Sequence, residues 1–327
     1  AVARYREQLR ERVEYHIFVQ MLFQRQWDKL RRYANERGVS LFGDMPIYIA
    51  EDSADTWTRP DIFQLDENRL PTRVAGVPPD YFSADGQKWG NPLYDWKKLK
   101  RQRYGWWVDR LRGTLERFDL VRIDHFIGFA NYYSIPVDSP TARTGKWVLG
   151  PGRSLFRRLR RELPQLAIVA EDLGEVNARV RRLLKWCGYP GMAVLSFGFG
   201  GDESNQHLPA QYVENQVVYT GTHDNDTFLG WLSAASEGEK ALARRVLGAQ
   251  EDPALLEAAI EALMQSRADR CVLPMQDVLG LGSEARMNTP GTIGGNWLWR
   301  MKPGAASPAA AKRLKELNER YARGSLC

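Results

Sequence analysis

The sequence has few of the residues and motifs that mark several large classes of protein. Its 327 residues include four histidines and three cysteines, with no CxxC pair and no HExxH motif, which argues against a zinc site. No GxGxxG motif follows a predicted strand and no GxxxxGK[ST] motif occurs, so a nucleotide-binding first turn is not expected. No apolar run reaches the roughly 18 residues of a membrane span.

What remains is the composition of a folded cytosolic protein. Hydrophobic residues make up 43% and charged residues 26% of the chain, which is typical of a large globular domain. Residues 1–20 are charged and amphipathic, unlike a signal peptide. The odd number of cysteines (Cys187, Cys271 and Cys327) indicates free thiols in a reducing compartment. We therefore expect a cytoplasmic protein with no membrane partner.

The net charge of +6 raises the possibility of a nucleic-acid partner. The basic residues are dispersed, however, and the densest stretch, residues 153–163, has the pattern of an amphipathic helix with its arginines facing solvent. We therefore expect no nucleic-acid partner.

Six apolar, β-branched runs alternate with helical patterns along the chain. They lie at residues 39–50, 120–126, 166–173, 192–199, 216–224 and 271–280. This alternation predicts an α/β fold with a parallel sheet. Without a glycine-rich first turn, a barrel is favoured over a doubly wound sheet. The chain opens with a helical pattern that stops at Gly38, so we expect residues 1–327 to form the C-terminal part of a (β/α)8 TIM barrel, with six of its eight strands.

Two stretches interrupt the alternation. Residues 51–95 lose periodicity and are rich in aromatic residues, which predicts an inserted substrate-binding loop region. Residues 234–268 predict a helical insertion, with Ser236 and Glu239 in capping-box spacing and Asp252 as the second N-cap. Several of the 11 tryptophans lie in loop-like stretches, where flat aromatic faces could pack on sugar rings. The alternative is that most of them are core residues.

Three carboxylates stand at the ends of three predicted strands. They are Asp124 in LVRIDHF, Glu171 in AIVAEDLG and Asp224 in VVYTGTHDND. In a parallel barrel the C-terminal ends of the strands meet at one face, so these side chains would share a pocket. Paired carboxylates are what cleavage and transfer of a glycosidic bond require.

Each of the first two carboxylates has a second interpretation. Arg122 lies on the same strand face as Asp124 and would favour the ionised form that a nucleophile needs, but the two could equally be a structural ion pair. The apolar residues before Glu171 favour the protonated form that a general acid needs. Glu171 could instead cap the following helix, a task that Asp172 could also perform.

The polar cluster at residues 221–227 is also open to two interpretations. His223 and Asp224 could hydrogen-bond sugar hydroxyls or could hold a metal ion. The scarcity of histidine favours substrate binding, so we expect no metal and no cofactor.

Several segments together resemble the amylomaltases, or disproportionating enzymes, which are the 4-α-glucanotransferases of glycoside hydrolase family 77. The resemblance covers nearly the whole chain. It is carried by residues 43–57, 75–96, 120–129 (LVRIDHFIGF), 169–174 (VAEDLG), 190–192, 217–226, 274–291 (PMQDVLGLGSEARMNTPG) and 295–300 (GNWLWR). The family's N-terminal portion, which builds the first two barrel strands, is expected to be missing from this sequence.

The resemblance implies a barrel of the α-amylase superfamily and a role for each matched residue. Asp124 would be the nucleophile, Glu171 the general acid/base and Asp224 the transition-state stabiliser. The matched substrate-binding residues are Arg122, His125 and His223 at the donor subsite, Asp80, Tyr81, Phe82, Gln87 and Trp89 in the aromatic loop region, and Asn288 in a loop over the cleft.

The implied activity is transfer of an α-1,4-glucan segment by a retaining double displacement. The substrates would be maltodextrin, glycogen or starch, and the two reacting carboxyl groups would lie about 5–5.5 Å apart. An α-1,4-glucan hydrolase and a non-catalytic glucan-binding domain are the alternatives.

Overall fold

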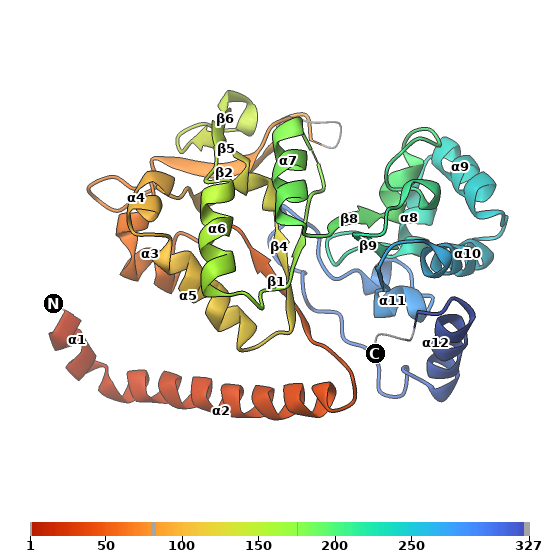
Figure 1. Ribbon diagram of the computed structural model, residues 1–327, viewed down its shortest axis with the longest axis horizontal. Coiled ribbons are helices and arrows are strands. Elements are labelled where there is room, and N and C mark those ends of the chain that lie inside the picture. The colour runs from red at the N-terminus through yellow and green to blue at the C-terminus, as the bar shows by residue number, and fades with distance from the viewer. Residues whose placement is uncertain (1, 80–82, 175, 324–327) are drawn as a thin grey trace. The chain divides into compact units, whose positions relative to one another are not determined.

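A computed structural model describes residues 2–79, 83–174 and 176–323 (Figure 1). The described chain divides into two compact units. The first unit comprises residues 2–75, 90–140 and 144–169, and the second comprises the remaining described residues. Both units combine helices with short strands, in agreement with the predicted α/β class.

A three-stranded sheet has the order β1 (Phe42–Pro46), β4 (Leu120–Asp124), β7 (Ile168–Ala170), and all of its residues except Ala170 belong to the first unit. β1 and β4 are parallel. Val121 and Ile123 of β4 are fully buried. α5 (Gly105–Leu115) contacts both β4 and α6 (Arg153–Glu162). α6 buries its leucines and Phe156, as the amphipathic pattern predicted.

A four-stranded sheet follows the order β3 (Gln87–Pro92), β2 (Arg73–Val77), β5 (Asn131–Pro136), β6 (Lys146–Leu149), with β5 and β6 antiparallel. β2 and β3 fall within residues 51–95, where the sequence shows no periodicity, and β5 and β6 fall outside the six predicted strands. β3 and β6 are largely exposed, so neither has the alternation of buried and exposed residues that identifies a strand. Their pairing depends on partners distant in the sequence.

Two helices open the chain, α1 (Val2–Gln8) and α2 (Arg10–Asn35). None of the 26 residues of α2, all of which the structure describes, is buried. Trp27 Nε1 donates to the Arg117 carbonyl at 2.8 Å, and Arg31 pairs with Asp119 at 2.7 Å. α2 is therefore anchored by its C-terminal half to the segment before β4.

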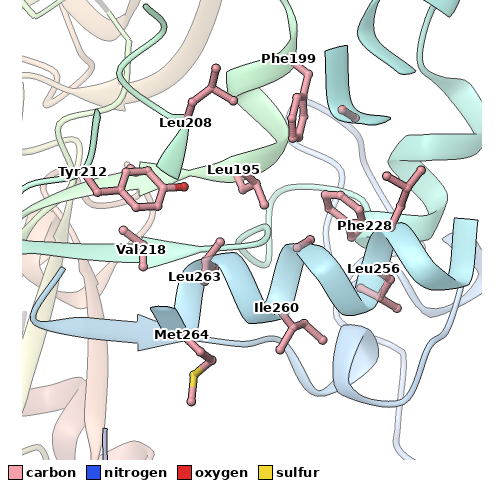
Figure 2. Close-up of a cluster of buried hydrophobic side chains, with 14 of the residues drawn as sticks. Leu195, Phe199, Leu208, Tyr212, Val218, Phe228, Leu256, Ile260, Leu263 and Met264 are labelled. Carbon is pink, nitrogen blue, oxygen red and sulfur yellow. The ribbon is translucent and has the colours of Figure 1, made fainter. Parts of the chain in front are cut away.

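The second unit has its own parallel sheet, in the order β10 (Arg270–Val272), β9 (Gln216–Tyr219), β8 (Gly191–Val194). Its main core cluster surrounds this sheet and α10 (Asp252–Gln265) (Figure 2). Leu256, Ile260 and Leu263 on one face of α10 belong to this cluster. The i, i+4 and i+7 spacing of these residues is typical of a helix with one buried face.

The remaining elements are short. The other α-helices are α3 (Ala54–Thr58), α4 (Trp96–Arg101), α7 (Ala178–Cys187), α8 (Phe228–Ala234), α9 (Glu237–Leu247), α11 (Met275–Val278) and α12 (Pro308–Arg320). The 3₁₀ turns are Pro60–Ile62, Phe126–Phe129, Ala142–Thr144, Leu195–Phe199, Pro209–Gln211 and Ser283–Ala285. In the part of the chain that the structure describes, every helix is too short or too polar to span a bilayer.

All six predicted strands exist, but each is shorter than predicted. Beyond β8 the apolar run continues as the 3₁₀ turn Leu195–Phe199, and beyond β10 Pro274 introduces the helix α11. A continuous apolar run indicates burial, and it does not distinguish a buried strand from a buried helical turn. The described strands form three sheets and no continuous six-stranded one, so the incomplete barrel stays a prediction.

The ends of the helices agree with the sequence-based predictions more closely than the ends of the strands do. The capping box of Ser236 and Glu239 is present, and Ser307 caps α12 through the Ala310 N–H. Two expectations were wrong in detail. The N-cap of α10 is Glu251 instead of Asp252, and α2 ends at Asn35, before Gly38, whose φ of +71° takes the chain out of the helical region.

Candidate active site

The end of β4 carries the first group of predicted site residues. Asp124 is the last residue of this strand, and Arg122 projects from the same face because strand side chains alternate. Arg122 Nη2 donates to Asp124 Oδ1 at 2.8 Å. Arg122 Nη1 donates to both carboxylate oxygens of Asp44, at 2.8 and 2.7 Å. One guanidinium therefore orients two carboxylates through charge-assisted hydrogen bonds.

Sequence reasoning missed Asp44. This residue lies directly opposite Arg122 in the parallel pairing of β1 with β4. A sequence shows that each strand exists, but it does not show the register that brings residues 78 positions apart together. The predicted ion pair of Arg122 and Asp124 is confirmed. The Arg122 side chain is 9% exposed and that of Asp124 is 40% exposed, so Asp124 can still meet a ligand.

His125 turns the chain out of β4. Its backbone has the left-handed φ of +52°, and the 3₁₀ turn Phe126–Phe129 follows directly. The imidazole is buried, and burial lowers the pKa of His125 to about 4. His125 is therefore neutral near neutral pH, and its ring is available for hydrogen bonding without a charge.

Glu171 follows β7 directly and belongs to the second unit. The residue is buried, and its Oε1 accepts a hydrogen bond from the Leu173 N–H at 2.7 Å. The next helix, α7, is capped by Asn177, whose Oδ1 accepts from the N–H groups of Arg179 and Val180 at 2.9 and 3.1 Å. The alternative that Glu171 or Asp172 caps this helix was therefore wrong.

Asp172 fixes the backbone beside Glu171. Its Oδ1 accepts from the Met192 N–H at 2.7 Å, at the start of β8. A Cβ on Gly191 would lie 2.5 Å from Asp172 Oδ2, so a larger residue at position 191 would force the Asp172 carboxylate to shift. Burial raises the pKa of Asp172 to about 6.

Asp224 lies in the segment of residues 221–227, which we call the Asp224 loop, between β9 and α8. Asn288 Nδ2 donates to Asp224 Oδ1 at 2.6 Å, and Arg286 Nη2 donates to the Asp224 carbonyl at 3.0 Å. His223 Nε2 lies 3.4 Å from Asp224 Oδ2, and the His223 ring is 5.2 Å from that of Trp297. The structure thus brings His223, Asp224 and Asn288 together.

The other polar residues of the Asp224 loop mainly hold its shape. Asn225 Oδ1 accepts from both the N–H and the hydroxyl of Thr222 at 2.8 Å. Asp226 accepts from the Ser283 hydroxyl at 2.7 Å, and Thr227 caps α8 through the Gly230 N–H. Among the described residues, no three His, Cys, Asp or Glu side chains are grouped as metal ligands. The clustering of polar residues in this loop has a structural cause.

The remaining predicted residues come from the aromatic-rich region. Gln87 and Trp89 are alternate residues of β3, and Trp89 Nε1 donates to Gln87 Oε1 at 3.0 Å. Asp80, Tyr81 and Phe82 lie outside the described residues. Arg122, Asp124 and His125 belong to the first unit, and the other described site residues belong to the second.

Comparison with known proteins gives consistent matches. The profile of glycoside hydrolase family 77, described as 4-alpha-glucanotransferase, matches residues 1–306. The chain is 48% identical over 318 residues to the 4-alpha-glucanotransferase of Thermus thermophilus, covering 95% of this chain and 64% of the relative. It is 46% identical over 321 residues to the chloroplastic/amyloplastic 4-alpha-glucanotransferase DPE1 of Arabidopsis thaliana, covering 97% of this chain and 56% of the relative.

Two solved structures are also similar. Amylomaltase from Streptococcus agalactiae in complex with acarbose has a TM-score of 0.95 and 39% identity, covering 99% of this chain and 66% of that one. Amylomaltase from Corynebacterium glutamicum is 20% identical with a TM-score of 0.75, and the match covers 95% of this chain and 49% of that one. At this identity the likeness shows a shared fold and nothing more. The chain thus spans between about half and two thirds of the length of the proteins it matches.

Proposed function

Because the chain belongs to glycoside hydrolase family 77, the 4-alpha-glucanotransferases, we propose that the protein moves a segment of α-1,4-glucan from a donor to the 4-hydroxyl of an acceptor glucan or glucose. The observation that carries this proposal is the family match over residues 1–306, with 48% identity to a named 4-alpha-glucanotransferase. Maltodextrin, glycogen and starch are the proposed donors. The S. agalactiae relative was solved with acarbose, and we propose that this site binds the same compound.

The proposed mechanism is a retaining double displacement. Asp124 attacks the anomeric carbon while Glu171 gives its proton to the leaving glycosidic oxygen, which frees the reducing-end portion of the donor. The 4-hydroxyl of the acceptor then attacks the same carbon and displaces Asp124, and its proton passes to the Glu171 carboxylate. Both residues return to their starting forms, and the linkage keeps its configuration.

The surroundings of each carboxylate support these roles. Asp124 is held by the Arg122 guanidinium and remains accessible, as a nucleophile requires. Glu171 is buried, and its Oε1 is fixed by the hydrogen bond from the Leu173 N–H, as a positioned proton donor requires. Asp224 accepts from Asn288, which holds it ready to bind sugar hydroxyls more tightly in the transition state than in the ground state.

The substrate-binding set extends this proposal. Arg122, His125 and His223 would line the donor subsite, and Asn288 would bind from its loop. Trp89 and Gln87 would contact the acceptor side together with Asp80, Tyr81 and Phe82. An aromatic wall of this kind would favour a sugar acceptor over water by excluding solvent and orienting the acceptor hydroxyl.

Two further parts of the proposal concern the whole protein. We propose that the described strands belong to a (β/α)8 barrel of the α-amylase superfamily, and the fold-level likeness to amylomaltases supports this. We also propose a cytoplasmic location. Its support is that both described cysteines, Cys187 and Cys271, are thiols instead of half-cystines.

Incubation of the intact protein with maltotriose tests the activity. Transfer produces glucose together with maltopentaose and longer oligosaccharides, which chromatography separates. Maltose and glucose alone would instead identify an α-1,4-glucan hydrolase. Binding of maltotriose without any product would identify a non-catalytic glucan-binding domain.

A further inference from the structure

A buried carboxylate that the proposed chemistry does not use lies behind the Asp224 loop. Asp277, in α11, is 1% exposed. Its Oδ2 accepts from the Thr220 hydroxyl at 2.5 Å, and its Oδ1 accepts from the Phe228 N–H at 2.8 Å. Thr220 immediately precedes the Asp224 loop and Phe228 immediately follows it. One carboxylate therefore ties both ends of the loop together.

A carboxylate suits this position because it offers two acceptor oxygens at a fixed separation. Its burial is costly, because an ionised group loses its hydration on leaving water. Burial, followed by the nearby charge of Asp226, raises the pKa of Asp277. An apolar residue would avoid this cost, but it would leave the Phe228 N–H buried without its acceptor. The two donors at the ends of the loop, the Thr220 hydroxyl and the Phe228 N–H, therefore explain why a carboxylate occupies position 277.

The same segment of chain also holds the tip of the loop. Arg286 and Asn288 follow α11 by a few residues, and they donate to the backbone and the side chain of Asp224. Ser283 donates to Asp226 in the same loop. Residues 275–288 therefore bind the Asp224 loop at its base through Asp277 and at its tip through Arg286 and Asn288.

We propose that Asp277 is a positioning residue for the transfer reaction: by fixing both ends of the Asp224 loop, it sets where the Asp224 carboxylate meets the substrate. This inference rests on the proposed function. Asp277 itself would not touch the glucan, since its two oxygens face Thr220 and Phe228. Loss of its carboxylate should weaken transition-state binding more than ground-state binding, because a small displacement of a positioned group mainly raises the barrier.

The test compares Asp277→Ala, Asp277→Asn and wild type in the intact enzyme, with maltotriose as substrate. We expect the alanine variant to lose about 100-fold in kcat per folded molecule, with KM within about threefold of wild type. The asparagine variant should stay within about tenfold of wild type, because its amide oxygen can accept from Phe228 and its amide nitrogen can donate to Thr220.

Asp119→Ala is the matched control, since Asp119 accepts from the Leu41 N–H and from Arg31 in the first unit. It should lower the thermal midpoint and leave kcat per folded molecule unchanged. If Asp277→Ala does not fold, Thr220→Val removes one of the two contacts and should lower kcat about three- to tenfold.

Two outcomes would overturn the inference while leaving the transferase proposal intact. One is wild-type kcat in folded Asp277→Ala, or in Thr220→Val where the alanine variant does not fold. The other is a loss of activity in Asp277→Ala that follows only its folded fraction, as in the control. Failure of the wild-type protein to elongate maltotriose would instead remove the proposed function itself.

Discussion

The two carboxylates proposed to react have different surroundings, and the difference matches their tasks. Asp124 is partly exposed and bound by a guanidinium, which stabilises its negative charge. Glu171 is buried and accepts a backbone hydrogen bond from the Leu173 N–H. Placing two acids in unlike environments is how a protein keeps one ionised and the other available as a proton donor.

Replacing either carboxylate by its amide should abolish most of the transfer activity. We expect Asp124→Asn and Glu171→Gln each to lower the initial rate with maltotriose at least about 1,000-fold, which corresponds to about 4 kcal/mol of transition-state stabilisation. Glu162→Gln, which removes a half-exposed partner of Arg158 on α6, is the control and should retain the wild-type rate. Wild-type rates in both amide variants would contradict the assignment.

Asp172 should make stability depend on pH in a defined direction. Burial raises the pKa of the Asp172 carboxyl to about 6, so folding disfavours its ionised form. Protonated Asp172 therefore contributes stability at low pH, and this contribution is lost as the pH rises from about 4 through about 6. Asp172→Asn cannot ionise. Relative to wild type, the variant should therefore gain up to about 3 kcal/mol between pH 4 and pH 7 in denaturant-unfolding experiments. Parallel pH curves for the two proteins would contradict this expectation.

At the scale of helices and strands, the core of the second unit depends on one face of α10. Ile260 is fully buried in this face, and Gln265 on the same helix is exposed. We expect Ile260→Ala to lower the free energy of unfolding by about 2–5 kcal/mol, through lost burial and a residual cavity. Gln265→Ala should change it by no more than about 0.5 kcal/mol. Denaturant titration of the two variants measures the difference, and equal effects would contradict the assignment of this face.

Local patterns were sufficient to predict most helices and to locate the strands. α9 and α12 begin with capping residues, Ser236 and Ser307, that act on backbone groups three positions away, so a short window of sequence contains the whole signal. The strands β2, β3, β5 and β6 escaped prediction because their stability comes from pairing across the sheet. The end of β10 was misplaced because an apolar run does not show where the backbone turns.

The candidate site divides in the same way. Asp124, Glu171 and Asp224 could be proposed from the sequence because each lies at or beyond the end of a recognisable apolar strand. Two buried or paired carboxylates that support the surroundings of these residues, Asp44 and Asp277, could not be found. Asp44 reaches Arg122 through strand register, and Asp277 reaches Thr220 across 57 residues. Neither contact leaves a trace in the local sequence.

At the scale of the whole molecule, the proposed chemistry draws on both compact units. Asp124 and its Arg122 partner belong to the first unit, and Glu171 and Asp224 belong to the second. Each unit has its own pair or set of parallel strands and its own buried residues. The proposed reaction therefore requires both units to be folded, and damage to either core should reduce activity.

Because the proposed displacement uses carboxylates alone, a chelator should have no effect. We expect preincubation of the intact protein with EDTA to leave the maltotriose transfer rate within about twofold of the untreated rate, as in a mechanism based on paired carboxylates. The matched control is the same incubation with EDTA already saturated with calcium. A loss of activity that added divalent cations restore would favour a metal-dependent reaction instead.

The absence of a side chain at Gly191 has a consequence for any mutational survey of this protein. A methyl group there would push Asp172 from its place and disturb the backbone that leads into the proposed acid. In a saturation library, active variants should therefore keep glycine at position 191 almost without exception, although this glycine has no side chain that could bind a sugar. Intolerance to substitution at position 191 would then report the support that Asp172 gives to the backbone beside Glu171. A designer seeking altered specificity should therefore leave this glycine unchanged.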